Sequence, residues 1–274
     1  MKLHFTKMHG IGNDFIVMEH NEVGSTTDLS ALAKRLCQRR FSVGADQVLL
    51  VCPSKIAEFK MRIFNADGTE VEMCGNGIRC FAKYLWDRGL SEKSVLSVET
   101  MAGIMFPEKS GDMVRVDMGE PVLEPSKIPV SSKEKIMNYP LDVHDQTFLV
   151  TCVSMGNPHT VVVLDDIETF PVEFYGPLIE HDSLFPKKTN VEFINISDRN
   201  NITMRVWERG AGETLACGTG ASAAAVAAHL LGLTERKVTV RLRGGDLLIE
   251  WSGQNNHLYM TGPAEEVFEG IVNL

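Results

Sequence analysis

Residues 61–77 read MRIFNADGTEVEMCGNG, and residues 204–220 read MRVWERGAGETLACGTG. The two stretches align without a gap at an offset of 143 residues, and Met, Arg, Glu, Cys and two Gly coincide. Agreement of this length within one chain indicates an internal duplication. The chain is therefore predicted to consist of two related halves, each carrying one Cys-Gly-x-Gly turn.

Three further matches follow in the same order along the chain. The segment 89–95 falls on 232–238, and Gln47 falls on Asn190, each ahead of a strand-like run. At an offset one residue larger, 144, Gly12-Asn13 matches Gly156-Asn157. Several ordered matches make duplication a better explanation than chance.

The boundary between the halves is predicted where prolines 121, 125 and 129 punctuate the chain. We assign residues 1–120 to an N-terminal half with Cys74 and residues 121–262 to a C-terminal half with Cys217. The last segment, 263–274, could join the sheet of the first half. Its apolar part, Val267–Leu274, could instead contribute to a dimer.

The order of elements is predicted to be the same in both halves. Short strands lead to the Cys-Gly-x-Gly turn, and a helix follows, over 78–88 in the first half and 221–231 in the second, stopped by Gly89 and Gly232. The second helix is small and apolar on every side, which is typical of a helix buried all round. Hairpins follow at 95–106 and 238–251, and 31–40 reads as an amphipathic surface helix. The expected fold class is α+β: two pseudo-symmetric domains, each a curved, mostly antiparallel sheet around a central helix.

The composition limits the classes of function. The net charge is −9, which argues against broad binding to nucleic acid or anionic membranes. We also find no apolar run long enough to span a bilayer. The six cysteines include no Cys-x-x-Cys pair, so we expect reduced thiols in the cytoplasm and no metal site.

Cys74 and Cys217 differ from the other four cysteines because each lies at a glycine-rich turn just before a helix. Unsatisfied N–H groups and the helix dipole favour negative charge there, and we expect them to lower the thiol pKa from about 8.5 toward neutrality. Cys37, Cys52, Cys80 and Cys152 lie in predicted helices or strands and are expected to be buried apolar side chains.

Two equivalent cysteines, one per half, suit the inversion of a stereocentre. If the halves close on one ligand, one thiolate can remove a proton while the other thiol returns a proton to the opposite face. The N–H groups of Gly75, Asn76, Gly218 and Thr219 could stabilise charge on a substrate carboxylate. A cysteine protease would instead need one thiolate with a histidine.

The residues that carry this pattern resemble the diaminopimelate epimerase family over essentially the whole chain. The resemblance rests on four stretches: residues 9–15 (HGIGNDF), 64–68 (FNADG), 74–80 (CGNGIRC) and 208–220 (ERGAGETLACGTG). It implies interconversion of LL- and meso-diaminopimelate in the synthesis of lysine and cell-wall precursors. It also implies no cofactor or metal, a cytoplasmic setting and a homodimer.

The resemblance also implies which residues form the site. Cys74, Cys217, His159 and Glu208 are the expected catalytic residues. The expected substrate-binding residues are Asn13, Gln47, Asn65, Gly75, Asn76, Asn157, Asn190, Glu208, Arg209, Gly218 and Thr219. For His159 a purely structural role stays open.

Three alternatives remain open from the sequence. A proline or hydroxyproline racemase would share the cysteines, but it would not need Asn65, Asn190 and Arg209 to hold a second amino-acid head. A non-catalytic amino-acid-binding protein would have no reason to keep both cysteines at helix starts. A thiol redox protein is disfavoured because each cysteine lacks a resolving partner nearby.

Overall fold

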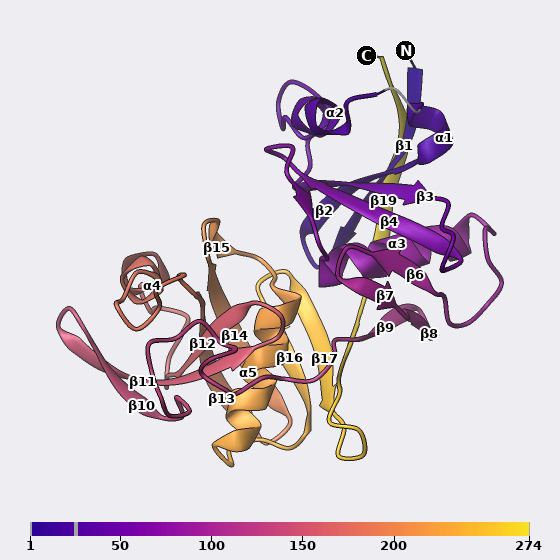
Figure 1. Ribbon diagram of the computed structural model, residues 1–274. Helices are drawn as coiled ribbons and strands as arrows, with labels where there is room; N and C mark the ends of the chain where they lie inside the picture. Colours follow the sequence, from indigo (N-terminus) through magenta and orange to yellow (C-terminus); the bar gives the residue numbers. More distant parts are fainter. Residues whose placement is uncertain (1, 25–26, 274) are drawn as a thin grey trace. The chain divides into compact units, whose positions relative to one another are not determined.

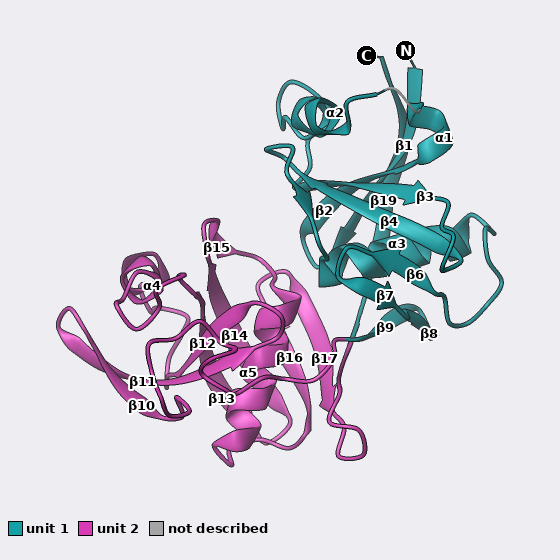
Figure 2. Cartoon of the chain, viewed as in Figure 1, with its two compact units in different colours: residues 1–117, 261–274 teal, residues 118–260 magenta. Residues whose placement is uncertain are grey.

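The computed structural model describes residues 2–24 and 27–273, which form two compact units (Figure 2). Unit 1 contains residues 1–117 and 261–274, and unit 2 contains residues 118–260. The boundaries predicted from the sequence lie at 120/121 and 262/263. The predicted C-terminal apolar segment includes Leu274, which lies outside the described residues.

Unit 1 begins and ends with paired strands (Figure 1). Its elements are β1 (Lys2–Gly10), β2 (Asn13–Glu19), α1 (His20–Val23), α2 (Leu29–Leu36), β3 (Gln47–Cys52), β4 (Phe59–Asn65), β5 (Glu70–Val71), α3 (Gly75–Asp87), β6 (Val98–Thr100), β7 (Gly103–Met105), β8 (Glu108–Ser110), β9 (Met113–Asp117) and β19 (Glu265–Asn273).

The sheet of unit 1 runs in the order β19-β1-β2-β3-β4-β6-β7, and β5 pairs with β4. Helix α2 covers one face, where Leu32, Ala33 and Leu36 join a core with Ile16 and Leu50. Helix α3 contacts β1, β2, β3 and β4, and it carries Cys74 at its start. The sheet therefore lies between two helices, and the conformation of the cysteine is tied to α3.

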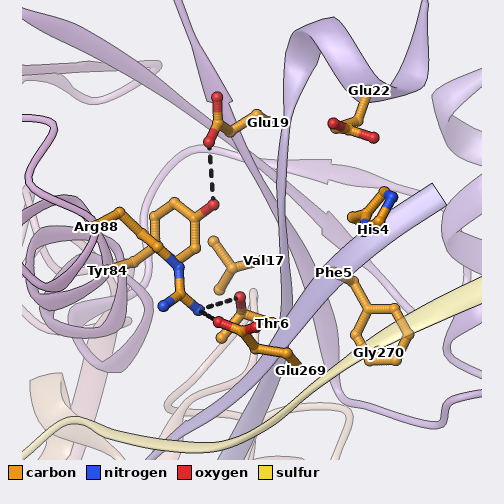
Figure 3. Close-up of a pocket in the computed structure, with 10 residues that line it drawn as sticks. All are labelled: His4, Phe5, Thr6, Val17, Glu19, Glu22, Tyr84, Arg88, Glu269 and Gly270. Carbon is orange, nitrogen blue, oxygen red and sulfur yellow. Dashed lines mark hydrogen bonds and ion pairs between the residues drawn. The ribbon is translucent and has the colours of Figure 1, made fainter.

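Backbone pairing with β1 and ion pairs hold strand β19 in this unit. It runs antiparallel to β1, from Lys2 opposite Asn273 to His9 opposite Glu265. Arg88, just after α3, donates to Thr6 Oγ1 at 3.0 Å and pairs with Glu266 and Glu269. Thr6, Arg88 and Glu269, together with Tyr84 and Glu19, line a small pocket (Figure 3). The pocket lies toward the C-terminal end of α3, a helix of 13 residues, whereas Cys74 caps the other end.

Unit 2 repeats the element order of unit 1 with two differences: one helix replaces two between the matched second and third strands, and the outer strand comes at the start of the unit instead of at its end (Figure 1). Its elements are β10 (Tyr139–Val143), β11 (Gln146–Ser154), β12 (Pro158–Val163), α4 (Val172–Glu180), β13 (Asn190–Asp198), β14 (Asn201–Glu208), β15 (Gly212–Thr214), α5 (Gly218–Leu230), β16 (Lys237–Leu242), β17 (Gly245–Trp251) and β18 (Leu258–Gly262), whose last two residues belong to unit 1.

The sheet of unit 2 contains the topology of the unit 1 sheet. Its order begins β10-β11-β12-β13-β14-β16-β17, with β15 paired to β14, and it continues past β17 to β18. The parallel neighbours are β2/β3 and β4/β6 in unit 1 and β12/β13 and β14/β16 in unit 2. Matching order and matching strand directions confirm the two-domain α+β fold expected from the repeat.

The predicted bounds of three helices were wrong. Helices α3 and α5 begin at Gly75 and Gly218, three residues before the predicted starts, because the glycines of each Cys-Gly-x-Gly motif form the first helical turn. The surface helix α2 spans Leu29–Leu36 instead of 31–40, with Asp28 accepting from the N–H of Ala31 as its N-cap. Among the described residues, no helix is long and apolar enough to cross a membrane.

Candidate active site

The register of each sheet brings the predicted polar residues into one row. In unit 1, Phe15 pairs with Gln47, and Gln47 pairs with Asn65. In unit 2, His159 pairs with Asn190, and the pairing of Val191 with Trp207 sets Asn190 beside Glu208. Side chains alternate between sheet faces along a strand, so each row presents its side chains to the face that α3 or α5 covers.

Cys74 is the N-cap residue of α3 and is half-buried. Its Sγ lies 3.5 Å from Asn13 Oδ1, and the thiol donates to this oxygen. The amide of Asn13 is held by Asp46, whose Oδ2 accepts from Asn13 Nδ2 at 2.8 Å. Asp46 therefore fixes which end of the Asn13 amide faces the thiol.

The first turn of α3 is stabilised by hydrogen bonds from the buried guanidinium of Arg79. Arg79 has no exposed surface and donates to the carbonyl of Gly75, to Asn76 Oδ1 and to the carbonyl of Pro263, at 2.9–3.2 Å. The amide of Asn76 donates in turn to Asn13 Oδ1 at 3.3 Å. The first-turn N–H groups of an α-helix have no acceptor within the helix, so Gly75 and Asn76 can offer theirs to a ligand.

Gln47 and Asn65 form a second polar pair in unit 1. Gln47 Nε2 donates to Asn65 Oδ1 at 2.7 Å, and Asn65 Nδ2 donates to Thr69 at 3.0 Å. The other amide atom of Gln47, Oε1, is buried and accepts no hydrogen bond from the described residues. A buried unsatisfied acceptor is costly, and a ligand ammonium would satisfy this one.

Cys217 is the N-cap residue of α5 and is only 6% exposed. Its Sγ accepts from the N–H of Gly220 at 3.4 Å and lies 3.5 Å from Thr219 Oγ1. The thiol also hydrogen-bonds to the carboxylate of Glu208. This cysteine therefore contacts donors on the helix side and a carboxylate on the sheet side.

The expected lowering of the pKa of Cys217 was wrong. Burial raises the pKa of this thiol well above its ordinary value, and the charges of Glu208 and Glu192 add to the effect. The hydrogen bonds from Thr219 and Gly220 oppose the rise without cancelling it. In this environment the helix dipole is too weak to decide the protonation state, and Cys217 rests as a thiol.

Glu208 is also shifted toward its protonated form. Burial raises its pKa, while the hydrogen bonds from Thr214 and Cys217 and the charge of His159 lower it in part. Thr214 donates to Glu208 Oε1 at 2.5 Å. A carboxyl and a thiol with raised pKa values thus lie side by side in unit 2.

His159 is fully buried beneath these groups. Its Nδ1 lies 2.7 Å from Glu192 Oε1, and its Nε2 lies 3.0 Å from Asn157 Oδ1. The amide of Asn157 donates at its other end to Thr219 at 3.3 Å. His159 is therefore connected to the helix turn of Cys217 through Asn157 and Thr219.

Asn190 and Arg209 lie at the end of the row in unit 2. The amide of Asn190 is 4% exposed, donates to the carbonyl of Pro158 at 2.9 Å and accepts from the backbone N–H of Arg209 at 2.9 Å. The exposed Arg209 side chain donates to the carbonyl of Lys187 at 3.2 Å. Asn190 thus positions Arg209, whose guanidinium can bind a carboxylate.

The four remaining cysteines are buried, as expected. Burial raises the pKa of Cys37 to about 11 and those of Cys80 and Cys152 to about 12, and it raises that of Cys52 as well. These thiols stay protonated at neutral pH. Within residues 2–24 and 27–273, no group of three or more His, Cys, Asp or Glu side chains is arranged to hold a metal ion.

Sequence reasoning missed four residues that shape the two half-sites: Asp46, Arg79, Glu192 and Thr214. Glu192 carried a usable signal, because it interrupts the apolar run 191–194 that faces a predicted core. Its counterpart at the repeat offset is Leu49. A charge in one copy where the other is apolar indicates a role specific to that copy.

Solved structures define the class of fold. A Bacillus anthracis phenazine biosynthesis protein of the PhzF family aligns over 100% of both chains, with a TM-score of 0.73 and 17% sequence identity. A hydroxyproline epimerase from Agrobacterium vitis, solved with bound trans-4-OH-L-proline, covers 99% of this chain and 92% of its own, with a TM-score of 0.69 and 15% identity. At these identities the likeness concerns the fold alone, and the chain has the duplicated α+β fold that these proteins share.

Sequence comparisons identify the family. The family model described as Diaminopimelate epimerase matches residues 5–124 and 151–267. The diaminopimelate epimerase of Moorella thermoacetica is 54% identical over 274 residues, and that of Acetivibrio thermocellus is 53% identical over 278, covering 98% and 99% of both chains respectively. The chain belongs to the diaminopimelate epimerase family. The resemblance and the enzyme class predicted from the sequence, an isomerase, are confirmed.

Proposed function

We propose that this enzyme interconverts LL- and meso-diaminopimelate with Cys74 and Cys217 as acid and base on opposite faces of the α-carbon. The observation that carries the proposal is the equivalence of the two cysteines. Each is the N-cap residue of the helix that covers the polar row of its unit. Inversion at one carbon needs a proton removed from one face and a proton delivered to the other, which two such groups supply.

The environments of the two thiols support distinct resting roles. Cys217 is buried and protonated, with Glu208 beside it, so it is suited to deliver a proton. When Cys217 gives up that proton, the N–H of Gly220 and the hydroxyl of Thr219 stabilise the thiolate. The reverse reaction exchanges the two roles.

A substrate with two amino-acid heads fits the polar groups. The first-turn N–H groups of Gly75, Asn76, Gly218 and Thr219 are proposed to bind the carboxylate at the reacting carbon, where negative charge develops in the transition state. For the distal head, Arg209 offers a guanidinium, and the buried Oε1 of Gln47 can accept from an ammonium. Asn13, Asn65, Asn157, Asn190 and Glu208 complete the proposed binding set.

The mechanism we propose uses no cofactor. Amino-acid α-protons are very weak acids, so the chain itself must stabilise the carbanion-like transition state. Exclusion of water strengthens electrostatic contacts to that charge, and two helix N-termini supply partial positive charge.

We further propose a homodimer that works in the cytoplasm, in the synthesis of lysine and cell-wall precursors. Strand β19 is the edge strand of the unit 1 sheet and exposes Val267, Phe268 and Ile271. An edge with exposed apolar side chains is a ready surface for association with a second copy. Sedimentation of the wild type and of Phe268→Glu would test this, since a dimer through β19 should dissociate in the variant.

The test of the activity is direct. Purified enzyme, dialysed against a chelator and hydroxylamine to remove metals and pyridoxal phosphate, is incubated with LL-diaminopimelate, and the products are separated by chiral chromatography. Appearance of the meso isomer supports the proposal, and proline and hydroxyproline serve as control substrates. Turnover of proline in place of diaminopimelate would contradict it, and binding without turnover of any amino acid would favour a non-catalytic binding protein.

A further inference from the structure

Glu192 is a buried carboxylate in the centre of the unit 2 sheet that the reaction proposed above does not use. It has no exposed surface, and its Oε1 lies 2.7 Å from His159 Nδ1. Its Oε2 accepts no hydrogen bond within residues 2–24 and 27–273. Burying a carboxyl group with one oxygen left without a hydrogen bond is costly.

Unit 1 avoids this cost. The repeat places Leu49 at the position of Glu192 and Phe15 at that of His159, and both are fully buried. The two side chains pack under α3, where Gly77 closely approaches Leu49 Cδ2 and Phe15 Cε1. The fold is therefore stable with apolar residues here, so the buried pair of His159 and Glu192 in unit 2 needs a reason other than folding.

The hydrogen bonds of His159 determine where its proton is held. Both ring nitrogens face acceptor oxygens, Glu192 Oε1 and Asn157 Oδ1. A neutral ring with its hydrogen on Nδ1 would set two acceptors, Nε2 and Asn157 Oδ1, against each other. The ring is therefore an imidazolium beside a carboxylate, or a neutral ring that accepts from a protonated Glu192. In both arrangements Nε2 carries a hydrogen and donates it to Asn157.

This donation orients the amide of Asn157. With Oδ1 occupied by His159, the NH₂ group points to Thr219 Oγ1 at 3.3 Å. The Thr219 hydroxyl then has its own hydrogen available for Cys217 Sγ, 3.5 Å away. Glu192 is also close to the cysteine turn, because a Cβ on Gly220 would lie 2.8 Å from Glu192 Oε1 and 3.2 Å from Cys217 Sγ.

From this chain of contacts we infer that Glu192 is a positioning residue: by holding His159 Nδ1 it keeps a proton on Nε2, and so orients Asn157 and Thr219 to stabilise the thiolate form of Cys217. The inference deepens the proposed function and rests on it only for the activity readout.

Four other ionisable groups lie around Glu192. They are His159 on β12, Cys152 on β11, Glu208 at the end of β14, and Cys217 at the start of α5. Helix α5 brings no charged or titratable side chain before His229. Any change in pH response after substitution of Glu192 must therefore arise within this small set.

Three variants separate positioning from packing. Glu192→Leu installs the residue of unit 1, and Glu192→Gln keeps the shape and a hydrogen-bonding oxygen but cannot carry charge. Glu180→Gln is the matched control. Glu180 is a buried glutamate of unit 2, away from Cys217, and its Oε2 accepts a hydrogen bond from Trp207 Nε1 at 2.7 Å. Thermal unfolding first establishes that all three variants fold.

The first readout does not depend on activity. In protein labelled with ¹⁵N in histidine, the ring nitrogens of His159 are assigned by comparison with His159→Asn and followed by long-range ¹H–¹⁵N NMR. We expect a hydrogen on Nε2 in the wild type and in Glu180→Gln, and a mixture of tautomers in Glu192→Leu.

The second readout is the pH profile of kcat and KM. We expect Glu192→Leu to lose about 10- to 100-fold in kcat with a smaller change in KM. The pH profile should differ in shape from that of the wild type, because the partner of His159 Nδ1 has been removed. Glu192→Gln should recover part of the loss.

A folded Glu192→Leu variant with wild-type tautomer and wild-type pH profile would overturn the inference. An equal loss in Glu192→Leu and Glu180→Gln would also overturn it, since that outcome assigns both residues to packing. A wild-type enzyme inactive on diaminopimelate would refute the proposed function but leave the NMR test intact.

Discussion

The two units share nearly the same arrangement of strands, but the side chains beneath their cysteines differ: they are apolar in unit 1 and ionisable in unit 2. Beneath Cys74 lie Phe15 and Leu49, whereas the equivalent positions beneath Cys217 hold His159 and Glu192. Arg79, the buried cation of α3, has Ser222 as its counterpart in α5. The duplicated backbone thus gives the two thiols equivalent positions, while the side chains around them have diverged, and those around Cys217 raise its pKa.

The largest effect is expected from removing either cysteine. Cys74→Ala and Cys217→Ala should each lower kcat by about 10²- to 10⁴-fold, because each removes one of the two proton-transfer groups. The rate of epimerisation is the measurement, with unfolding curves to show that the fold is intact.

Cys152→Ala is the matched control for these two variants. Cys152 is a buried cysteine of unit 2 whose thiol contacts Thr160 and lies outside the proposed mechanism. It should lose stability but keep its rate of epimerisation. Full activity in Cys74→Ala or in Cys217→Ala would break the two-cysteine mechanism.

The next largest effect is a loss of stability when alanine replaces one of the glycines that allow each helix to approach its sheet. A Cβ on Gly220 would lie 2.8 Å from Glu192 Oε1, which is too close, whereas a Cβ on Gly77 would meet its nearest neighbours at 3.3–3.4 Å. Gly220→Ala should therefore destabilise the protein by about 1–3 kcal/mol. In Gly77→Ala the tighter packing is offset by the better helix propensity of alanine, worth about 1 kcal/mol. Urea unfolding of both variants makes the comparison, and equal losses would contradict it.

A smaller effect is expected from an acidic residue that only unit 1 has. Burial would raise the pKa of Asp14, but hydrogen bonds from Arg39 and Lys7 and the charge of Lys7 outweigh it and lower the pKa from 3.8 to about 2. Because the folded pKa is below the unfolded one, Asp14 stabilises the fold above about pH 4, and this contribution is lost as the pH falls toward 2. After allowance for solvent screening, Asp14→Asn should cost about 1–2 kcal/mol at neutral pH.

Pro158 stands at the equivalent position of unit 2. Hydrogen exchange between pH 4 and 2, followed by mass spectrometry of peptides from each unit, should therefore show the effect of Asp14→Asn mainly in unit 1. Equal changes in both units would show that Asp14 is not specific to the stability of unit 1.

The smallest effect is a shift in pH dependence. Thr214 donates to Glu208 and lowers its pKa against the effect of burial, while the equivalent residue in unit 1 is Val71. Thr214→Val should raise the pKa of Glu208 further, and the limb of the kcat/KM profile that reports Glu208 should move to higher pH. Val71→Thr, the converse change in unit 1, should leave that limb in place. A shift to lower pH in Thr214→Val would contradict the assignment.

Much of the fold could be predicted from the sequence because the repeat is long and its patterns are local. The alignment of 61–77 with 204–220 is enough to pair Gln47 with Asn190 and Asn65 with Glu208, and the sheet register sets these residues in equivalent rows. The helix starts were misplaced because glycine is a poor helix former. Here its lack of a side chain is needed for the close approach of each helix to the sheet.

The charge environment of the cysteines could not be predicted in the same way. A helix start alone indicates a low thiol pKa, but the pKa of Cys217 depends on its burial and on Glu192 and Glu208 from two other strands. The orientation of the Asn13 amide similarly depends on Asp46, 33 residues away in the sequence. Such effects follow from contacts between distant segments, which local patterns do not encode.

The most direct test of the two-cysteine mechanism is the position of deuterium at early times in heavy water. The enzyme is incubated with LL-diaminopimelate in deuterated buffer, and the meso product and the remaining LL substrate are separated and analysed by mass spectrometry before equilibrium is approached. Two groups acting on opposite faces predict one deuterium in each product molecule and almost none in the recovered substrate. Product that keeps its original hydrogen, or substrate that gains deuterium as fast as the product forms, would show that a single group both removes and returns the proton, and would contradict the account.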